Sequence, residues 1–397
     1  MQISPIPTLS EEINDIRLRT ADIVANRIIP NESTIYAGGD KSKKLRKEIN
    51  EEVKKQGLWA PHLPSEYGGM DNGFLELAYM NEILAWSPLG NRLFGVIAPN
   101  SGNQKILVKY GTDEQKKKWL IPLINQEMES GFSMTEPDSA GSDPRSLKTT
   151  AVKEGDEWVI NGTKMWVTNG TRASLVMLLA RTPDDRITCF LVEKEPGENF
   201  EGITVSKKID KLGYRGLETV EMSYVDHRVP SENVLGGEDG IGNGRRYALS
   251  ALELGRINIA ARAVGVAQAA FDSAMKYAQQ RETFGRPIFE HQAVQFMLAE
   301  MATKLQASRL MTFDAARRAD AGERVDMEAG MAKFFASEAA FEIAMSSMRI
   351  HGGNGYTTEF PVERYLRDTP LMIIGEGTSE IQKMVIARKL LERYPAE

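Results

Sequence analysis

The middle of this chain is marked by one stretch, Trp158-Val159-Ile160-Asn161-Gly162-Thr163-Lys164-Met165-Trp166-Val167-Thr168. It is rich in the β-branched and aromatic residues that favour strands, and it follows a period of two. Asn161-Gly162 supplies the positive φ angles that a tight turn requires. The stretch therefore predicts a β-hairpin that turns at Asn161-Gly162.

Further short strands are predicted after this stretch, over residues 175–180, 188–192 and 220–224. Turn residues separate these segments, and no long helical pattern lies between them. Such spacing is typical of an antiparallel sheet or barrel and argues against a doubly wound parallel sheet. We therefore expect a middle β domain over residues 131–240.

Outside this segment the apolar residues recur at helical spacing. Residues 1–130 contain three such runs, which end at Pro30, at Gly57 and at Ser87-Pro88. Two buried stripes are predicted within residues 241–397: Val264, Ala267, Phe271, Ala274 and Ala278, and Phe334, Phe341, Met345 and Met348. The predicted fold is multidomain α+β, with an N-terminal helical domain over 1–130, the middle β domain, and a C-terminal four-helix bundle over 241–397.

Composition narrows the class of protein. The chain has 397 residues, of which 42% are hydrophobic and 26% charged, and its formal net charge is −6. Because no basic tract dominates, nucleic-acid binding is not expected. No apolar run is long enough to span a bilayer, and the N-terminus lacks the pattern of a secretory signal. We therefore expect a cytoplasmic protein, or a mature form whose targeting segment is absent.

Cysteine and histidine residues indicate no metal or thiol chemistry. The single cysteine, Cys189, lies in an apolar run and is expected to pack inside a strand. His62, His227 and His291 have no metal-ligand spacing to cysteine or acidic residues, so no metal site is predicted. His351 is expected to serve packing or hydrogen bonding.

The residues that point to chemistry stand near the C-terminus, at Gly375-Glu376-Gly377-Thr378-Ser379-Glu380-Ile381-Gln382. Here a carboxylate lies between two glycines, just before a helix start whose N–H groups are free to bind a polar group. A carboxylate beside such amides can remove a proton while the amides hold the oxygen that gains charge. Taken alone, the octapeptide also fits an ordinary loop glutamate before a capped helix.

Four further clusters stand upstream in a consistent order: residues 132–137 with 140–143, residues 164–170, residues 281–285 with 290–292, and residues 351–356. With the Glu376 segment, they resemble the acyl-CoA dehydrogenase family in order and spacing. The resemblance extends from about residue 10 to the end of the chain. It implies an FAD-dependent enzyme that oxidises an acyl-CoA thioester to a trans-2-enoyl-CoA.

The resemblance also implies a set of cofactor contacts. Residues around Thr135 would bind the flavin ring, while Trp166 and Thr168, two apart on a strand and thus on one face, would lie against it. Arg281, Thr283 and Phe284, expected to end a helix at Gly285, would bind FAD held mainly by a neighbouring subunit. The full implied FAD set is Phe132, Met134, Thr135, Gly141, Ser142, Trp166, Thr168, Arg281, Thr283, Phe284, Gln292, Gly353, Thr378 and Glu380.

For the substrate, the resemblance assigns the catalytic base to Glu376 and the electron acceptor to electron-transfer flavoprotein. It implies a homotetramer built as a dimer of dimers. The implied substrate contacts are Ser142, Glu253, Arg256, Gly377 and Arg388. Glu253 and Arg256 fit an ordinary ion pair on a helix face equally well.

Several positions depart from the family pattern. Gly255 stands where some relatives carry the base, which favours Glu376 as the sole base. The loop after Pro137 is one residue longer than usual, Glu253 replaces a frequent Asp, and Arg349 replaces a Gln. Gly375 replaces a common Tyr, and we expect its missing ring to admit branched or cyclic acyl groups.

Two other functions stay open at this point. One is a relative that uses oxygen directly, such as an acyl-CoA oxidase, a flavin monooxygenase or a desulfinase. The other is a non-catalytic CoA-binding scaffold.

Overall fold

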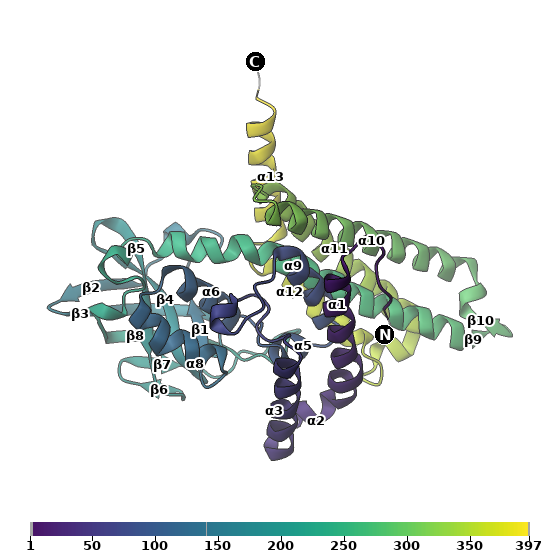
Figure 1. Cartoon of the computed structure of the whole chain (residues 1–397), viewed down its shortest axis with the longest axis horizontal. Helices are drawn as coiled ribbons and strands as arrows, with labels where there is room; N and C mark the ends of the chain where they lie inside the picture. Colours follow the sequence, from purple (N-terminus) through teal and green to yellow (C-terminus); the bar gives the residue numbers. More distant parts are fainter. Residues whose placement is uncertain (1–2, 140, 396–397) are drawn as a thin grey trace.

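The computed structural model describes residues 3–139 and 141–395, without the side chains of residues 184 and 251–254. Helices come first, a sheet follows, and a long helical bundle completes the chain (Figure 1). The predicted order of helix, sheet and helix is therefore confirmed. No helix in the described residues is long and apolar enough to cross a membrane.

The N-terminal region packs short helices around buried apolar side chains. Ser10 caps the first helix by accepting a hydrogen bond from the Ile13 N–H at 3.2 Å. Trp86 and Phe94 are almost fully buried beside these helices. The helices are α1 (Glu11–Ile23), α2 (Glu32–Tyr36), α3 (Gly39–Lys55), α4 (Phe74–Leu84), α5 (Gly90–Leu93), α6 (Asn100–Tyr110), α7 (Asp113–Gln115) and α8 (Ile121–Ile124).

The middle region is one mixed sheet in the order β1-β4-β2-β3-β8-β7-β6, with β5 paired to β4. Most neighbours are antiparallel, as predicted, but β4 runs parallel to β1 and to β2. Cys189 is buried in β5, as expected, and burial raises the pKa of its thiol to about 12. The strands are β1 (Glu129–Ser133), β2 (Thr150–Glu154), β3 (Glu157–Thr168), β4 (Ala173–Thr182), β5 (Arg186–Glu193), β6 (Asn199–Phe200), β7 (Ile203–Val205) and β8 (Thr219–Pro230).

The hairpin predicted at Asn161-Gly162 is wrong, because β3 continues through it. The pairing of β3 with β8 shifts register between Ile160 and Gly162, which marks a β-bulge. Asn161 Nδ2 donates to Asp226 Oδ1 at 3.0 Å, and a Cβ on Gly162 would lie 2.5 Å from Thr149 Oγ1. Asn161-Gly162 thus forms a bulge within a long strand. The turn before β3 lies at Gly155, whose φ is +63°.

The C-terminal region is built on α9 (Gly244–Gln280), whose 37 residues span about 55 Å. Asn243, just before α9, bridges to Ile187 of β5, so this helix starts at the sheet and runs away from it (Figure 1). The stripe predicted along α9 is buried except for Phe271, which is half-buried. The remaining elements are β9 (Glu282–Thr283), β10 (Arg286–Pro287), α10 (Gln292–Asp320), α11 (Asp326–His351), α12 (Val362–Ile374) and α13 (Ser379–Arg393).

Two bundle predictions need correction. The Phe and Met stripe on α11 is only half-buried, and the fully buried face of that helix carries small residues such as Ala336, Ala340 and Ala344. Small side chains there let α9 and α11 approach closely. Likewise, no helix ends at Gly285, because α9 stops at Gln280 and residues 282–287 form the β9–β10 hairpin.

Candidate active site

Glu376 lies in the tight connection between α12 and α13. Its φ is +52° and that of Gly377 is +89°, so both residues adopt left-handed backbone conformations. Thr378 ends this turn by capping α13, accepting a hydrogen bond from the Ile381 N–H at 3.3 Å. The turn directs the Glu376 side chain to α9 of the bundle.

Gly255 of α9 lies directly against the Glu376 carboxylate. A Cβ added to Gly255 would come within 2.0 Å of Glu376 Oε2. Any side chain at position 255 would therefore occupy the space of the carboxylate. The absence of a base at this position, noted in the sequence, is thus also a steric requirement.

Charge and burial act in opposite directions on Glu376. Burial raises the pKa of its carboxyl, while the nearby cations Arg262, Lys333 and Lys105 lower it. These cations come from α9, α11 and α6 respectively. A carboxyl whose pKa is raised from its usual value is a stronger base once ionised.

The sheet presents a second group of predicted residues. Phe132 lies in β1 next to its last residue, and Met134 and Thr135 follow the strand. A Cβ on Gly141 would lie 2.6 Å from Thr135 Oγ1. These residues are half-buried, whereas Ser142 is exposed. The glycine therefore lets the 141–142 backbone close against Thr135.

Trp166 lies beside this loop, but not through simple strand alternation. Its φ is +64°, and the register of β3 against β8 shifts between Lys164 and Val167. This second bulge leaves the Trp166 residue 55% exposed, with Thr168 half-buried and Val167 in the core. The Met165 N–H donates to the Thr135 carbonyl at 2.8 Å, so the bulge and the loop are joined.

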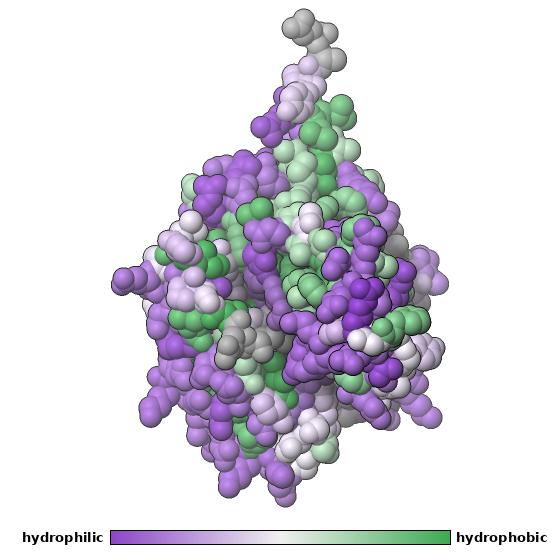
Figure 2. Space-filling model, turned by 90° about the vertical axis from the view of Figure 1, so that its right-hand side faces the viewer, coloured by the Kyte–Doolittle hydropathy of each residue, from purple (hydrophilic) through white to green (hydrophobic). Residues whose placement is uncertain are grey.

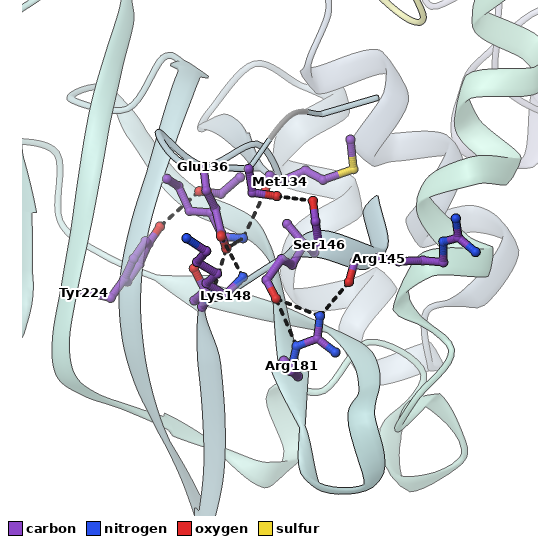
Figure 3. A network of polar contacts seen from close by, with 12 residues as sticks. Met134, Glu136, Arg145, Ser146, Lys148, Arg181 and Tyr224 are labelled. Atoms are coloured by element: carbon purple, nitrogen blue, oxygen red, sulfur yellow. Dashed lines mark hydrogen bonds and ion pairs between the residues drawn. The ribbon is translucent and has the colours of Figure 1, made fainter. Parts of the chain in front are cut away.

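A buried polar network holds this loop in place (Figure 3). Glu136 accepts hydrogen bonds from the Lys148 and Thr149 N–H groups and from Lys164 Nζ, the last at 2.9 Å. Lys164 Nζ also donates to the Met134 carbonyl at 2.9 Å. Burial opposes ionisation of Glu136, but the hydrogen bonds from Thr149 and Lys164 outweigh it and lower its pKa. The network is thus an ionised pair that fixes the backbone on both sides of Thr135.

A third group of predicted residues gathers at the opposite end of α9. Arg281, Thr283 and Phe284 lie in or beside the β9–β10 hairpin, and Thr283 Oγ1 lies 3.0 Å from His291 Nε2. Gly353 belongs to the same end, since Asn354 Nδ2 donates to the Tyr277 hydroxyl at 2.9 Å. Gln292 and Gly353 are exposed, and Phe284 is 96% exposed. Within one chain, the length of α9 separates this group from the sheet.

The other predicted residues surround Glu376 or lie on α13. Glu380 is exposed in the first turn of α13, and Arg388 is exposed two turns later. Arg256 is half-buried on α9, while the side chain of Glu253 lies outside the described part of the chain. His351 makes hydrogen bonds to the Ser347 carbonyl and to Ser273, and its ring stacks on Tyr277, which matches the packing and hydrogen-bonding role predicted for it.

Sequence reasoning missed the residues that support the site. Glu136, Lys164 and Gln382 lie inside the quoted clusters but received no role there, and Lys333 lies in none of the clusters. The only sequence signal is a lysine inside an apolar helical run, as in Met331-Ala332-Lys333-Phe334. A lysine placed among core residues indicates a buried polar role.

Comparison with known proteins agrees with this arrangement. Profiles of the acyl-CoA dehydrogenase N-terminal, middle and C-terminal domains match residues 10–127, 131–226 and 242–391. A 3-(aryl)acrylate reductase of Clostridium sporogenes is 40% identical, covering 89% of this chain and 92% of its own length. The mitochondrial short-chain specific acyl-CoA dehydrogenase of Rattus norvegicus is 41% identical, covering 86% of this chain and 83% of its own.

A solved structure is similar over nearly the whole fold. A chain from a structure of the electron transferring flavoprotein of Acidaminococcus fermentans has a TM-score of 0.84 and 34% identity. The match covers 98% of this chain and 100% of that one. The profiles cover all three regions, including the sheet loop and the Glu376 turn. The chain therefore belongs to the acyl-CoA dehydrogenase family, and it is an oxidoreductase of that family.

Proposed function

We propose that this enzyme oxidises an acyl-CoA thioester to the trans-2-enoyl-CoA with FAD as its cofactor and Glu376 as its base. The main support is the Glu376 carboxylate, which lies against Gly255 with its pKa raised by burial. Such a carboxylate, next to the amides of a helix start, suits proton removal beside a carbonyl.

In the proposed reaction, ionised Glu376 removes the pro-R α-proton of the thioester. The Glu376 N–H holds the thioester oxygen, which gains negative charge as the proton leaves. Entry of the acyl chain excludes water and raises the pKa of the carboxyl further. Bound FAD supplies the acceptor for the hydride that leaves the β-carbon.

The sheet residues fit a flavin ring. Gly141 closes against Thr135, and Trp166 offers an exposed indole beside the same loop. In the proposal, Phe132, Met134, Thr135, Trp166 and Thr168 hold the isoalloxazine. Gly141 and Ser142 approach the pyrophosphate, and Ser142 also faces CoA.

The bundle-end residues support a shared cofactor site and hence an oligomer. Within one chain, Arg281, Thr283 and Phe284 lie at the end of α9 that is remote from the sheet, and α9 is about 55 Å long. They therefore cannot contact the same FAD as Trp166 of their own chain. A neighbouring subunit would bring the two groups together. We assign Gln292, Gly353, Thr378 and Glu380 to the same shared cofactor.

Exposed apolar surface is consistent with the proposed homotetramer. Helix α13 projects from the bundle, and Figure 2 shows apolar residues along it. Leu391 is 74% exposed, and an apolar groove of about 360 Å³ runs between α13 and the half-buried Phe334 of α11. A second subunit would cover such surfaces. Electron-transfer flavoprotein is the proposed electron acceptor, supported by the family and by the similar chain from Acidaminococcus fermentans.

Two kinds of acyl group are candidates for the substrate: a short straight chain, and a branched or aromatic group. The relative named as a short-chain specific acyl-CoA dehydrogenase supports the short chain, and the relative named as a 3-(aryl)acrylate reductase supports the aromatic group. The reductase also supports the reverse reaction, in which a double bond is reduced. Gly375 has a structural role as well, since a Cβ there would lie 2.9 Å from the Leu371 carbonyl oxygen. Turnover of straight-chain thioesters alone would contradict the prediction that Gly375 widens the pocket.

The decisive experiment is anaerobic titration of the purified yellow enzyme with a panel of CoA thioesters. We expect at least one saturated thioester to bleach the flavin, and Glu253, Arg256, Gly377 and Arg388 variants to weaken its binding. Peroxide release in air would favour an oxygen-using relative. A colourless protein that releases no flavin on heating would favour a scaffold.

A further inference from the structure

Lys333 of α11 occupies an unusual position beneath the Glu376 turn. The residue has 0% exposure, and its Nζ donates to the Ile373 carbonyl at 3.0 Å and to the Gly377 carbonyl at 2.8 Å. These two carbonyls bracket Glu376 in the chain. Within the described residues, neither hydrogen bond of this cation goes to a carboxylate.

A neutral donor would suffice if the only task were to hold the turn. Gln382 already makes such a contact, since its Nε2 donates to the same Gly377 carbonyl at 3.1 Å. A buried ammonium bonded to neutral carbonyls carries a large desolvation penalty. The positive charge therefore calls for a separate explanation.

The neighbouring charges provide that explanation. Glu376 faces Lys333 from α11, Arg262 from α9 and Lys105 from α6. Lys333 in turn faces Glu376, Glu338 of its own helix and Glu380 of α13. Glu338 is bonded by Ser379 Oγ at 2.7 Å, and Glu380 is exposed, so Glu376 is the carboxylate that the Lys333 contacts hold in place.

We propose that Lys333 is the positioning residue of the catalytic base: it fixes the left-handed turn at Glu376 and Gly377, and its charge favours the ionised base. This role rests on the proposed function of Glu376. Hydrogen bonds to both flanking carbonyls restrict the turn, while the nearby ammonium opposes the effect of burial on the carboxyl. The Lys333 side chain thus determines both the position and the protonation state of the Glu376 carboxyl.

Three substitutions separate position from charge. Lys333→Met removes both the hydrogen bonds and the charge, and Gln382→Met removes a neutral contact to Gly377. Lys105→Met removes a cation of α6 that acts on the Glu376 carboxylate through its charge. Turn mobility is measured as hydrogen exchange of peptides covering residues 371–383. Ionisation of Glu376 is followed without turnover, from the infrared difference between each variant and its Glu376→Gln counterpart across pH.

We expect Lys333→Met to increase exchange of the turn, to shift the ionisation of Glu376 to higher pH, and to slow flavin reduction at pH 7 by about 10²-fold. Of the two non-kinetic readouts, Gln382→Met should change the exchange of the turn and not the ionisation of Glu376, and Lys105→Met should change the ionisation and not the exchange. FAD content and melting temperature serve as folding controls. If Lys333→Met fails to fold, Lys333→Gln replaces it, keeping a neutral donor and still shifting the ionisation.

The proposal is overturned if folded, FAD-containing Lys333 variants ionise Glu376 at the wild-type pH, or if the exchange of the turn does not change in Lys333→Met. Failure of the proposed function has a different signature. In that case no thioester bleaches the wild-type flavin, while the exchange and infrared measurements still report on Lys333.

Discussion

At the residue scale, Glu376 owes its position to a backbone conformation that non-glycine residues rarely adopt. Its φ of +52° costs energy, which the surrounding contacts must offset. Lys333, Gln382 and Thr378 supply such contacts from two helices. The strained turn therefore coincides with the proposed catalytic residue.

Removing the carboxylate should slow proton abstraction and leave cofactor binding intact. We expect Glu376→Gln to keep FAD and to lose about 10²- to 10⁴-fold in the rate of flavin reduction, the usual share of a general base. Stopped-flow absorbance under anaerobic conditions measures this rate. Bleaching at a near-wild-type rate would remove Glu376 from its assigned role.

The raised pKa of Glu376 has a defined effect on pH dependence. The base acts only when ionised, so flavin reduction should increase as pH rises through a value above the usual 4.5 of a glutamate. The folded state holds this proton more tightly than the unfolded state does. Between the two pKa values, stability should therefore fall as pH rises. Rates of flavin reduction measured across pH test the first expectation, and denaturant unfolding at several pH values tests the second.

Space at Gly255 is as important as charge at Glu376. Gly255→Ala would place a methyl group 2.0 Å from the carboxylate oxygen and displace the base. We expect about a 10²-fold slower flavin reduction with FAD retained. Gly102→Ala on α6 is the control, because nothing lies within 4 Å of its Cβ position. Equal rates in the two variants would contradict this account.

At the element scale, the loop between β1 and β2 is held by the Lys164–Glu136 pair. The two side chains are 0% and 4% exposed. Because removal of one partner leaves a buried charge, Lys164→Met should lower the free energy of unfolding by about 3–5 kcal/mol. Arg228→Gln, which breaks exposed pairs to Glu154 and Glu157, should cost at most about 1 kcal/mol. Denaturant titration compares the two variants, and similar losses would argue against a buried pair.

At the scale of the whole molecule, most of the predicted FAD residues form two groups at opposite ends of α9, while Thr378 and Glu380 lie at the start of α13. If subunits share the cofactor, dissociation should release it. We expect dilution to lower the fraction of bound FAD together with the assembly state, and Arg281→Ala to weaken FAD binding without loss of helix content. Analytical ultracentrifugation monitored at the flavin band measures both quantities. A monomer that retains FAD would contradict the shared site.

Several features of this protein could be predicted from the sequence because they depend on neighbours along the chain. Helical and strand periods predicted the order of helix, sheet and helix, and the Gly375–Gln382 segment predicted a capped turn that carries an acid. Thr378 does cap α13. The burial of Cys189 followed from its apolar run.

Other features arise from contacts between distant segments, which no local pattern contains. Asn161-Gly162 suits a hairpin, yet pairing with β8 makes it a bulge. Lys333 lies more than 40 positions before Gly377, and the Gly255 contact with Glu376 joins two different helices. Such contacts form only when packing brings their elements together, so the protonation and placement of the base depend on the folded chain.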